Sequence, residues 1–161
     1  PVMTAPYLGG IGNFQNDPHV AQQCFITSEP LTAAAAGLDV KTFLVADSGY
    51  NPYTSVLVTS RRRWQKSPAE VKSMVDAVRS GWNSYLQDPA STNTAMLTLN
   101  KAMSAQTFAQ SAQAQRALIK TSTTERVGEM TWERWQALAD QLLDIKVIQQ
   151  PVAVGDLFVS L

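Results

Sequence analysis

The chain has 161 residues, which suffices for one domain with its own core and is too short for two independent ones. Its 13 basic and 13 acidic residues cancel, and the charged fraction of 16% lies below the ~25% usual in soluble domains, which argues against nucleic acid as a partner. No run approaches the ~18 apolar residues of a membrane helix, so we expect a soluble chain.

The chain opens at Pro1 with no Met, no charged leader and no apolar signal core. We therefore expect that a preceding segment has been removed. Residues 2–5 are predicted to form a strand. The glycines at 9–12 are predicted to form a turn, because their spacing is too irregular for a phosphate-binding loop.

Helices and strands are then predicted to alternate. A short helix is expected over 18–22, and another over 30–36 with proline in its first turn and glycine just past its end. Strands are expected over 23–27 and 40–46, which are rich in β-forming residues. The order strand, helix, strand, helix, strand predicts an α/β fold with parallel pairing and a short sheet in the first third.

The second predicted strand ends in two hydroxyls and a carboxylate, those of Thr27, Ser28 and Glu29. A strand tip is where a rigid scaffold can offer hydrogen-bonding groups to a ligand. Within the strand, Cys24 is interpreted as a small buried hydrophobe rather than a nucleophile. His19 is interpreted as a surface or helix-start residue because it lacks partners at metal-binding spacing.

A loop dense in turn formers spans residues 47–53 and leads into a predicted strand over 54–59. Loops at strand ends often carry ligand contacts. Its two tyrosines, Tyr50 and Tyr53, could stack on a flat ligand, or they could only cover the edge of the sheet. Both interpretations stay open.

From Ser67 onward the chain is predicted to be helical nearly to its end. Ser67 and Glu70 form a capping-box pattern at the first helix, which ends before the Asp-Pro pair at 88–89. Further helices are predicted over 92–99, 104–119 and 131–145, the last with Thr131 as its cap. The apolar face of the first helix is predicted to be core: Val71, Met74, Val75, Val78, Trp82, Tyr85 and Leu86.

The sequence lacks the groups of residues that are typical of enzyme active sites. The sequence shows no Ser/His/Asp set, no metal-ligand spacing and no phosphate loop. The basic cluster Arg61, Arg62, Arg63 and Lys66 is interpreted as a solvated turn. The chain is therefore predicted to be a binding module, not an enzyme, without a cofactor or metal.

Six segments together resemble a known family. The segments are QQCFITSEP at 22–30, FLVADSGYNPY at 43–53, VLVT at 56–59, GW at 81–82, YLQDP at 85–89 and MTWERW at 130–135. In their order and spacing they resemble the C-terminal half of substrate-binding proteins of ABC importers, of the nitrate/sulfonate/taurine type that includes the NMT1/THI5-like, thiamine-pyrimidine-precursor group. The resemblance runs over almost the whole chain.

The resemblance implies a two-lobed, periplasmic-binding-protein-like (type II) fold of which this chain is the second half. Residues 1–46 would form part of the second lobe, 47–59 the hinge, and 60–161 helices that pack on the first lobe. Because the N-terminal half would be absent, exposed apolar surface is expected to be covered by a partner chain or by self-association.

The resemblance also implies a ligand site and a role. The positions that match the family's cleft are Thr27, Ser28, Glu29, Tyr50, Asn51 and Tyr53. A carboxylate at Glu29 would accept hydrogen bonds from an aminopyrimidine and repel a sulfonate or nitrate, which favours a heteroaromatic ligand over a small oxyanion. Alternatively, Glu29 only satisfies free amides at a helix start.

A bacterial, periplasmic solute-binding protein that delivers its ligand to an ABC permease is thus the expected function. A THI5-like pyrimidine synthase with the same fold is the alternative. The yeast synthases use an N-terminal histidine and a cysteine-rich motif, neither of which is found here. Relatives tend to have Gly at the position of Cys24, and Cys24 alone does not support the enzyme.

Overall fold

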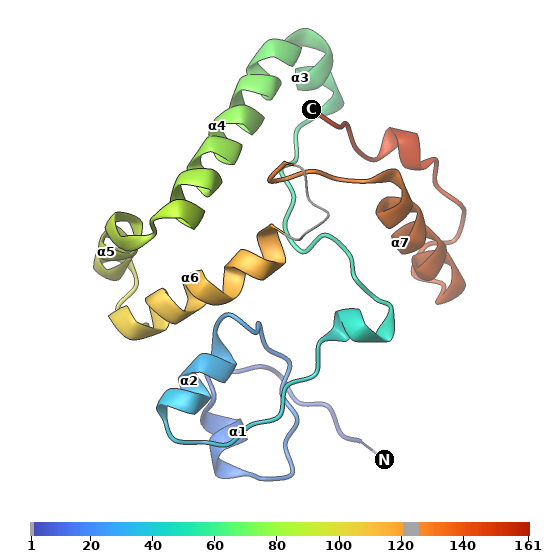
Figure 1. Cartoon of the computed structure of the whole chain (residues 1–161). Helices are drawn as coiled ribbons and strands as arrows, with labels where there is room; N and C mark the ends of the chain where they lie inside the picture. The colour runs from blue at the N-terminus through green and yellow to red at the C-terminus, as the bar shows by residue number, and fades with distance from the viewer. Residues whose placement is uncertain (1, 121–125) are drawn as a thin grey trace. The chain divides into compact units, whose positions relative to one another are not determined.

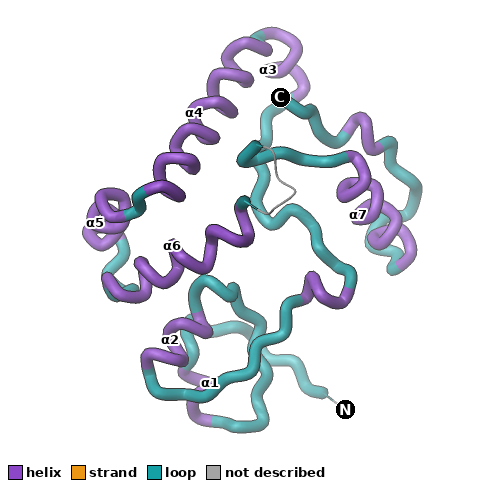
Figure 2. The backbone as a smooth tube through the Cα atoms, viewed as in Figure 1, coloured by secondary structure: helices purple, strands orange, loops and turns teal. Residues whose placement is uncertain are grey.

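The computed structural model describes residues 2–120 and 126–161, and the regular elements in these ranges are helices (Figure 1). Over these ranges no segment is a β-strand (Figure 2). The predicted α/β fold, with a short sheet in the first third of a periplasmic-binding-protein-like fragment, is therefore wrong.

The missing sheet has a physical reason. Residues 2–5, 23–27, 40–44 and 54–59 are rich in β-forming side chains, yet none of them pairs with another segment among the described residues. A strand exists only in a ladder, and β-propensity reports how well a side chain fits a half-buried pleated surface. Residues 45–48, predicted as strand and loop, instead form the 3-10 helix η1 (Val45–Ser48).

The chain divides into two compact units, each built from two sequence segments. The first comprises residues 1–42 and 88–118 and contains α1 (Gly12–Asn16), α2 (Glu29–Ala35), α5 (Ala90–Leu99) and most of α6 (Ala105–Ile119). Its buried apolar side chains include Ile11, Ala33, Phe108 and Ala112.

Helix α2 confirms the predicted helix over 30–36 to within one residue. It ends in a Schellman motif: the N–H of Gly37 donates to Ala34 O at 3.0 Å, and the N–H of Leu38 donates to Ala33 O at 3.0 Å. The motif needs a left-handed residue after the last turn, and Gly37 has φ +77°. A glycine meets that requirement without strain.

The predicted helix over 18–22 is wrong, because the first helix lies earlier, at α1. Asp17 and His19 form a tight turn after it, in which the N–H of His19 donates to Asp17 Oδ1 at 2.8 Å. Such a side-chain bond competes with helix formation at this point. The predicted helices over 92–99 and 104–119 are confirmed by α5 and α6.

The second unit comprises residues 43–87 and 119–161. It contains η1, α3 (Arg61–Lys66), α4 (Pro68–Gln87), α7 (Trp132–Asp144) and the 3-10 helix η2 (Val154–Asp156). Helix α3 packs against α4, and α7 packs against η2. Both predicted long helices, after Ser67 and over 131–145, are confirmed.

Arg79 on α4 ties together distant parts of the second unit. Its Nε donates to Val127 O at 3.0 Å and its Nη2 to Leu161 O at 3.0 Å, while Nη1 pairs with Asp76 at 2.9 Å. The side chain is largely buried, so its three bonds replace water as hydrogen-bond partners. Arg79 therefore joins α4 to two segments more than forty residues away.

The predicted core face of α4 is not buried. Met74 is 61% exposed and Trp82 is 37% exposed. The carboxylate of Glu70 in the predicted capping box pairs with Arg63 of α3 at 2.7 Å. Periodicity identified the helix correctly, but no residue of α4 is fully buried. None of the described helices is long and apolar enough to cross a membrane.

Candidate functional site

The first three candidate residues lie at the start of α2, in the first unit. Glu29 is its first residue and Ser28 is its N-cap, and together with Thr27 they are half-buried. The Ser28 carbonyl accepts from the N–H of Leu31 and of Thr32, each at 3.1 Å. The turn before the helix thus holds all three side chains at one end of α2.

Two hydrogen bonds join the carboxylate of Glu29 to other parts of the first unit. Tyr7 Oη donates to Oε1 at 2.8 Å, and the N–H of Phe25 donates to Oε2 at 3.1 Å. The Tyr7 hydroxyl in turn accepts from the N–H of Gly10 at 3.0 Å. Glu29 therefore links the start of the chain to the turn before α2.

Partial desolvation acts to raise the pKa of Glu29, but hydrogen bonds outweigh it. The bonds from the Tyr7 hydroxyl, the backbone amides of Glu29 and Phe25, and the Ser28 side chain favour the charged form, and the net pKa is lowered. The same bond raises the pKa of the Tyr7 hydroxyl. Glu29 is therefore a carboxylate at neutral pH.

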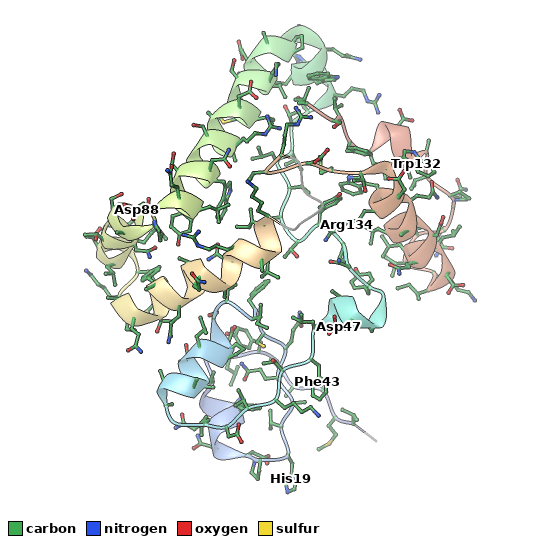
Figure 3. The ribbon with its side chains drawn as sticks, viewed as in Figure 1. His19, Phe43, Asp47, Asp88, Trp132 and Arg134 are labelled. Atoms are coloured by element: carbon green, nitrogen blue, oxygen red, sulfur yellow. The ribbon has the colours of Figure 1, made fainter. Side chains whose placement is uncertain are left out.

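Cys24, predicted to be buried, is exposed. Its apolar neighbours suggested a buried strand, and without the strand the thiol reaches solvent. Partial desolvation, and then the negative charge of Glu29, raise the pKa of the Cys24 thiol, which makes it a poor nucleophile. His19 is exposed in its turn (Figure 3), as predicted.

The other three candidates, Tyr50, Asn51 and Tyr53, lie in the second unit. We call residues 49–53 the tyrosine loop. Tyr50 is 40% exposed, Asn51 is exposed and Tyr53 is half-buried. The loop begins at Gly49, which has φ +91° after η1. It docks on the first turns of α7, about eighty residues further along the chain.

Arg134, on the first turn of α7, makes most of this contact (Figure 3). Its Nε donates to Asn51 O at 2.6 Å, and its Nη2 donates to Asn51 Oδ1 at 2.8 Å and to Pro52 O at 2.9 Å. Its Cζ lies 4.1 Å from the ring centroid of Tyr53, a cation–π distance. No carboxylate of the described chain forms an ion pair with Arg134.

Two further bonds complete the docking of the tyrosine loop. The N–H of Thr131 donates to Tyr53 Oη at 2.8 Å, and Gln141 Nε2 donates to Gly49 O at 2.9 Å. Thr131 also caps α7 as predicted, because its side chain accepts from the N–H of Arg134 at 3.3 Å.

An aromatic cluster continues from the loop into the second unit. Trp135 lies 5.7 Å from Tyr53 and 5.8 Å from Phe158, between ring centroids, and the second pair is stacked. The buried Nε1 of Trp135 has no hydrogen-bond partner among the described residues. Trp135 therefore contacts both the tyrosine loop and Phe158 near the end of the chain.

The structure thus brings together Thr27, Ser28 and Glu29 in one unit, and Tyr50, Asn51 and Tyr53 in the other. Sequence reasoning missed Arg134. A signal was available: an arginine in a helix's first turn opposes the helix dipole, and Arg134 has no acidic residue three or four positions away to compensate. Such a cation needs acceptors from elsewhere in the fold.

Neither of two hollows on the described surface is lined by the six candidates. One of about 300 Å³ is in the first unit, between the end of α1 and residues 38–40. The other, about 390 Å³, is in the second unit and is lined by Ser60, Arg62, Arg63, Lys66 and Ser67. The described residues contain no group of His, Cys, Asp or Glu side chains that could hold a metal ion.

Residues 16–92 match the family model described as NMT1/THI5 like. The match confirms the predicted resemblance to the NMT1/THI5-like group over this stretch, which includes all six candidate residues. Searches of curated proteins and of solved structures gave no significant match. The match supports a solute-binding or THI5-like protein.

Proposed function

We propose that the chain is part of the solute-binding component of an ABC importer and that it binds a small heteroaromatic ligand of the aminopyrimidine kind. The match of residues 16–92 to the NMT1/THI5-like model carries this proposal. The ligand-binding residues proposed are Thr27, Ser28, Glu29, Tyr50, Asn51 and Tyr53.

The chemistry of Glu29 supports an amine-bearing ligand. Its pKa is lowered because hydrogen bonds outweigh desolvation, so the group is charged at neutral pH. An amino group on a heterocycle would donate to it, whereas a sulfonate or nitrate would be repelled. Tyr50 supports a flat ligand, because its ring is partly exposed.

The proposed setting is the bacterial periplasm, with an ABC permease as the protein partner. The division into lobes at 1–46, 47–59 and 60–161 stays a prediction. A covering partner chain or self-association is proposed for residues 56–58, which lie outside the helices and are apolar and exposed, Val58 by 87%. An unpaired apolar segment of this kind is suited to pairing with another chain.

A thermal-shift screen tests the ligand proposal. The chain is heated with aminopyrimidines, flavin-like heterocycles, sulfonates and nitrate, beside Glu29→Gln, which keeps the shape and removes the charge. The proposal predicts that aminopyrimidines raise the Tm of the wild type and do so less in the variant. Stabilisation by sulfonates alone, with no difference in Glu29→Gln, would contradict it.

A THI5-like pyrimidine synthase is the alternative, because the matched family description names that group as well. The two functions differ in what happens to the ligand. A binding protein returns the heterocycle unchanged, whereas a synthase forms a pyrimidine from other molecules. Mass spectrometry of the small molecules released from the purified protein distinguishes these outcomes.

A further inference from the structure

The tyrosine loop directs its hydrogen-bond acceptors toward α7. Five acceptor atoms in residues 49–53 are engaged there, and every donor comes from Thr131, Arg134 or Gln141. The acceptors are Gly49 O, Asn51 O, Asn51 Oδ1, Pro52 O and Tyr53 Oη.

The side-chain donors of the loop have no partner among the residues that the structure describes. Asn51 uses Oδ1 on Arg134, so its Nδ2 amide carries two N–H groups that bond to no described residue. Tyr53 accepts from Thr131 and keeps its own O–H proton. The Tyr50 hydroxyl also has no partner in the described chain, and it can donate or accept.

The side chain that holds the loop in place is positively charged. Arg134 brings a full positive charge to three neutral oxygens of the loop and has no carboxylate to neutralise it within the described chain. A group that approaches the loop therefore meets N–H and O–H donors backed by a cation.

We propose that the tyrosine loop is a donor surface fixed by Arg134, and that it selects the acceptor edge of a ligand. The proposal rests on the proposed function and narrows its ligand class. Acceptors of the right kind are a ring nitrogen or a carbonyl of a pyrimidine, or an oxyanion oxygen. Asn51 supplies the contact, and Arg134 is a positioning residue because it fixes the amide orientation.

Asn51→Asp separates the ligand contact of Asn51 from the positioning of the loop by Arg134. The aspartate still offers an oxygen to Arg134, now as an ion pair, so the docking of the loop survives. Its second oxygen replaces the Nδ2 donor and turns the outward group into a charged acceptor. Asn83→Asp, on the exposed surface of α4 in the same unit, makes the same chemical change and serves as the matched control.

The test titrates the wild type and both variants by calorimetry with four probes: 4-aminopyrimidine, pyrimidine-2,4-dione, methanesulfonate and benzamidinium. The first two carry neutral acceptors, the third an oxyanion, and the fourth only donors. We expect Asn51→Asp to keep the Tm and to weaken acceptor binding about tenfold or more, with Asn83→Asp unchanged. Whether the dione or the sulfonate binds distinguishes neutral from anionic acceptors.

Two results would overturn the donor surface: equal acceptor binding by the wild type and Asn51→Asp, or tighter binding of benzamidinium than of the acceptor probes by the wild type. Should Asn51→Asp unfold, Tyr50→Phe replaces it, because it removes an O–H donor of the loop that has no partner in the described chain. Its acceptor binding is expected to fall, and unchanged binding would again overturn the proposal.

A measurement without ligand tests the donor surface separately from the proposed function. In ¹⁵N-labelled wild type, the Asn51 side-chain amide protons should exchange freely with water, while the Arg134 Nε proton should be protected. Protected Asn51 protons would overturn the donor surface. Free Asn51 protons in a chain that binds no probe would support the geometry described for the loop and contradict the proposed function.

Discussion

Arg134 lies over the ring of Tyr53 although 81 positions separate them in the chain, with its Cζ 4.1 Å from the ring centroid. The same guanidinium donates three hydrogen bonds to Asn51 and Pro52. One side chain of α7 thus fixes the loop that carries half of the candidate ligand residues. The shape of that loop therefore depends on a residue outside it.

Arg134→Gln should destabilise the second unit. The change removes the cation–π contact and leaves the loop oxygens without their donors, which predicts a loss of about 1–3 kcal/mol in the free energy of unfolding. Urea denaturation measures this loss in the free energy of unfolding. Arg62→Gln is the matched control, because Arg62 is exposed and bonds to no described residue, and its effect should stay within about 0.5 kcal/mol. Equal effects of the two changes would contradict the docking role.

Glu29 should make the stability of the first unit depend on pH. Hydrogen bonds outweigh desolvation and lower its pKa in the folded chain from 4.5, so the carboxylate stabilises the fold above that value. The contribution is lost as pH falls through the lower folded pKa. Urea unfolding at pH 7, 4.5 and 3 should show a smaller acid loss in Glu29→Gln than in the wild type.

The control for that experiment is Glu133→Gln, which removes an exposed carboxylate at the start of α7 and makes the same change in net charge. A pH profile of Glu29→Gln that coincides with that of Glu133→Gln would show that the contacts of Glu29 contribute nothing. The difference between the two profiles isolates the bonds from Tyr7 and Phe25.

Tyr7→Phe should raise the pKa of Glu29. It removes the 2.8 Å hydrogen bond that favours the carboxylate and leaves the ring in place. A ¹³C NMR titration of the Glu29 side chain measures the change. Tyr50→Phe removes a hydroxyl with no described partner and should leave the titration of Glu29 unchanged. If Tyr7→Phe also leaves it unchanged, the contact is not formed in solution.

Lys146→Gly should stabilise the chain. Lys146 follows the last turn of α7 with φ +61°, and its N–H donates to Leu143 O while that of Val147 donates to Leu142 O. This is the Schellman motif that Gly37 forms after α2. Lysine has a Cβ atom, which disfavours the left-handed backbone conformation that the motif requires. We expect a gain of about 0.5–1 kcal/mol in urea denaturation. A loss would show that the Lys146 side chain makes favourable contacts.

Local signals predicted the helices well. The proline before the alanine run and Gly37 bound α2, Thr131 caps α7, and the long helix α4 follows Ser67. Each signal acts within one or two turns, so the neighbouring residues determine the outcome. The same local reasoning failed over 23–27 and 54–59, since a strand needs a partner that propensity does not supply.

The candidate site was predictable in part. The resemblance identified Glu29 and the tyrosine loop, and the family match covers both. The partners of the loop could not be deduced, because Thr131, Arg134 and Gln141 lie about eighty to ninety positions away. Only the fold brings such residues together, and no periodic pattern records their pairing.

The most direct test of the proposed function is calorimetric titration of the chain with 4-aminopyrimidine, beside the double variant Glu29→Gln, Asn51→Ala. The proposed function predicts saturable binding at one site, of micromolar strength or tighter, and a loss of about tenfold or more in the variant. The absence of binding by the wild type, or equal binding by the two proteins, would contradict it.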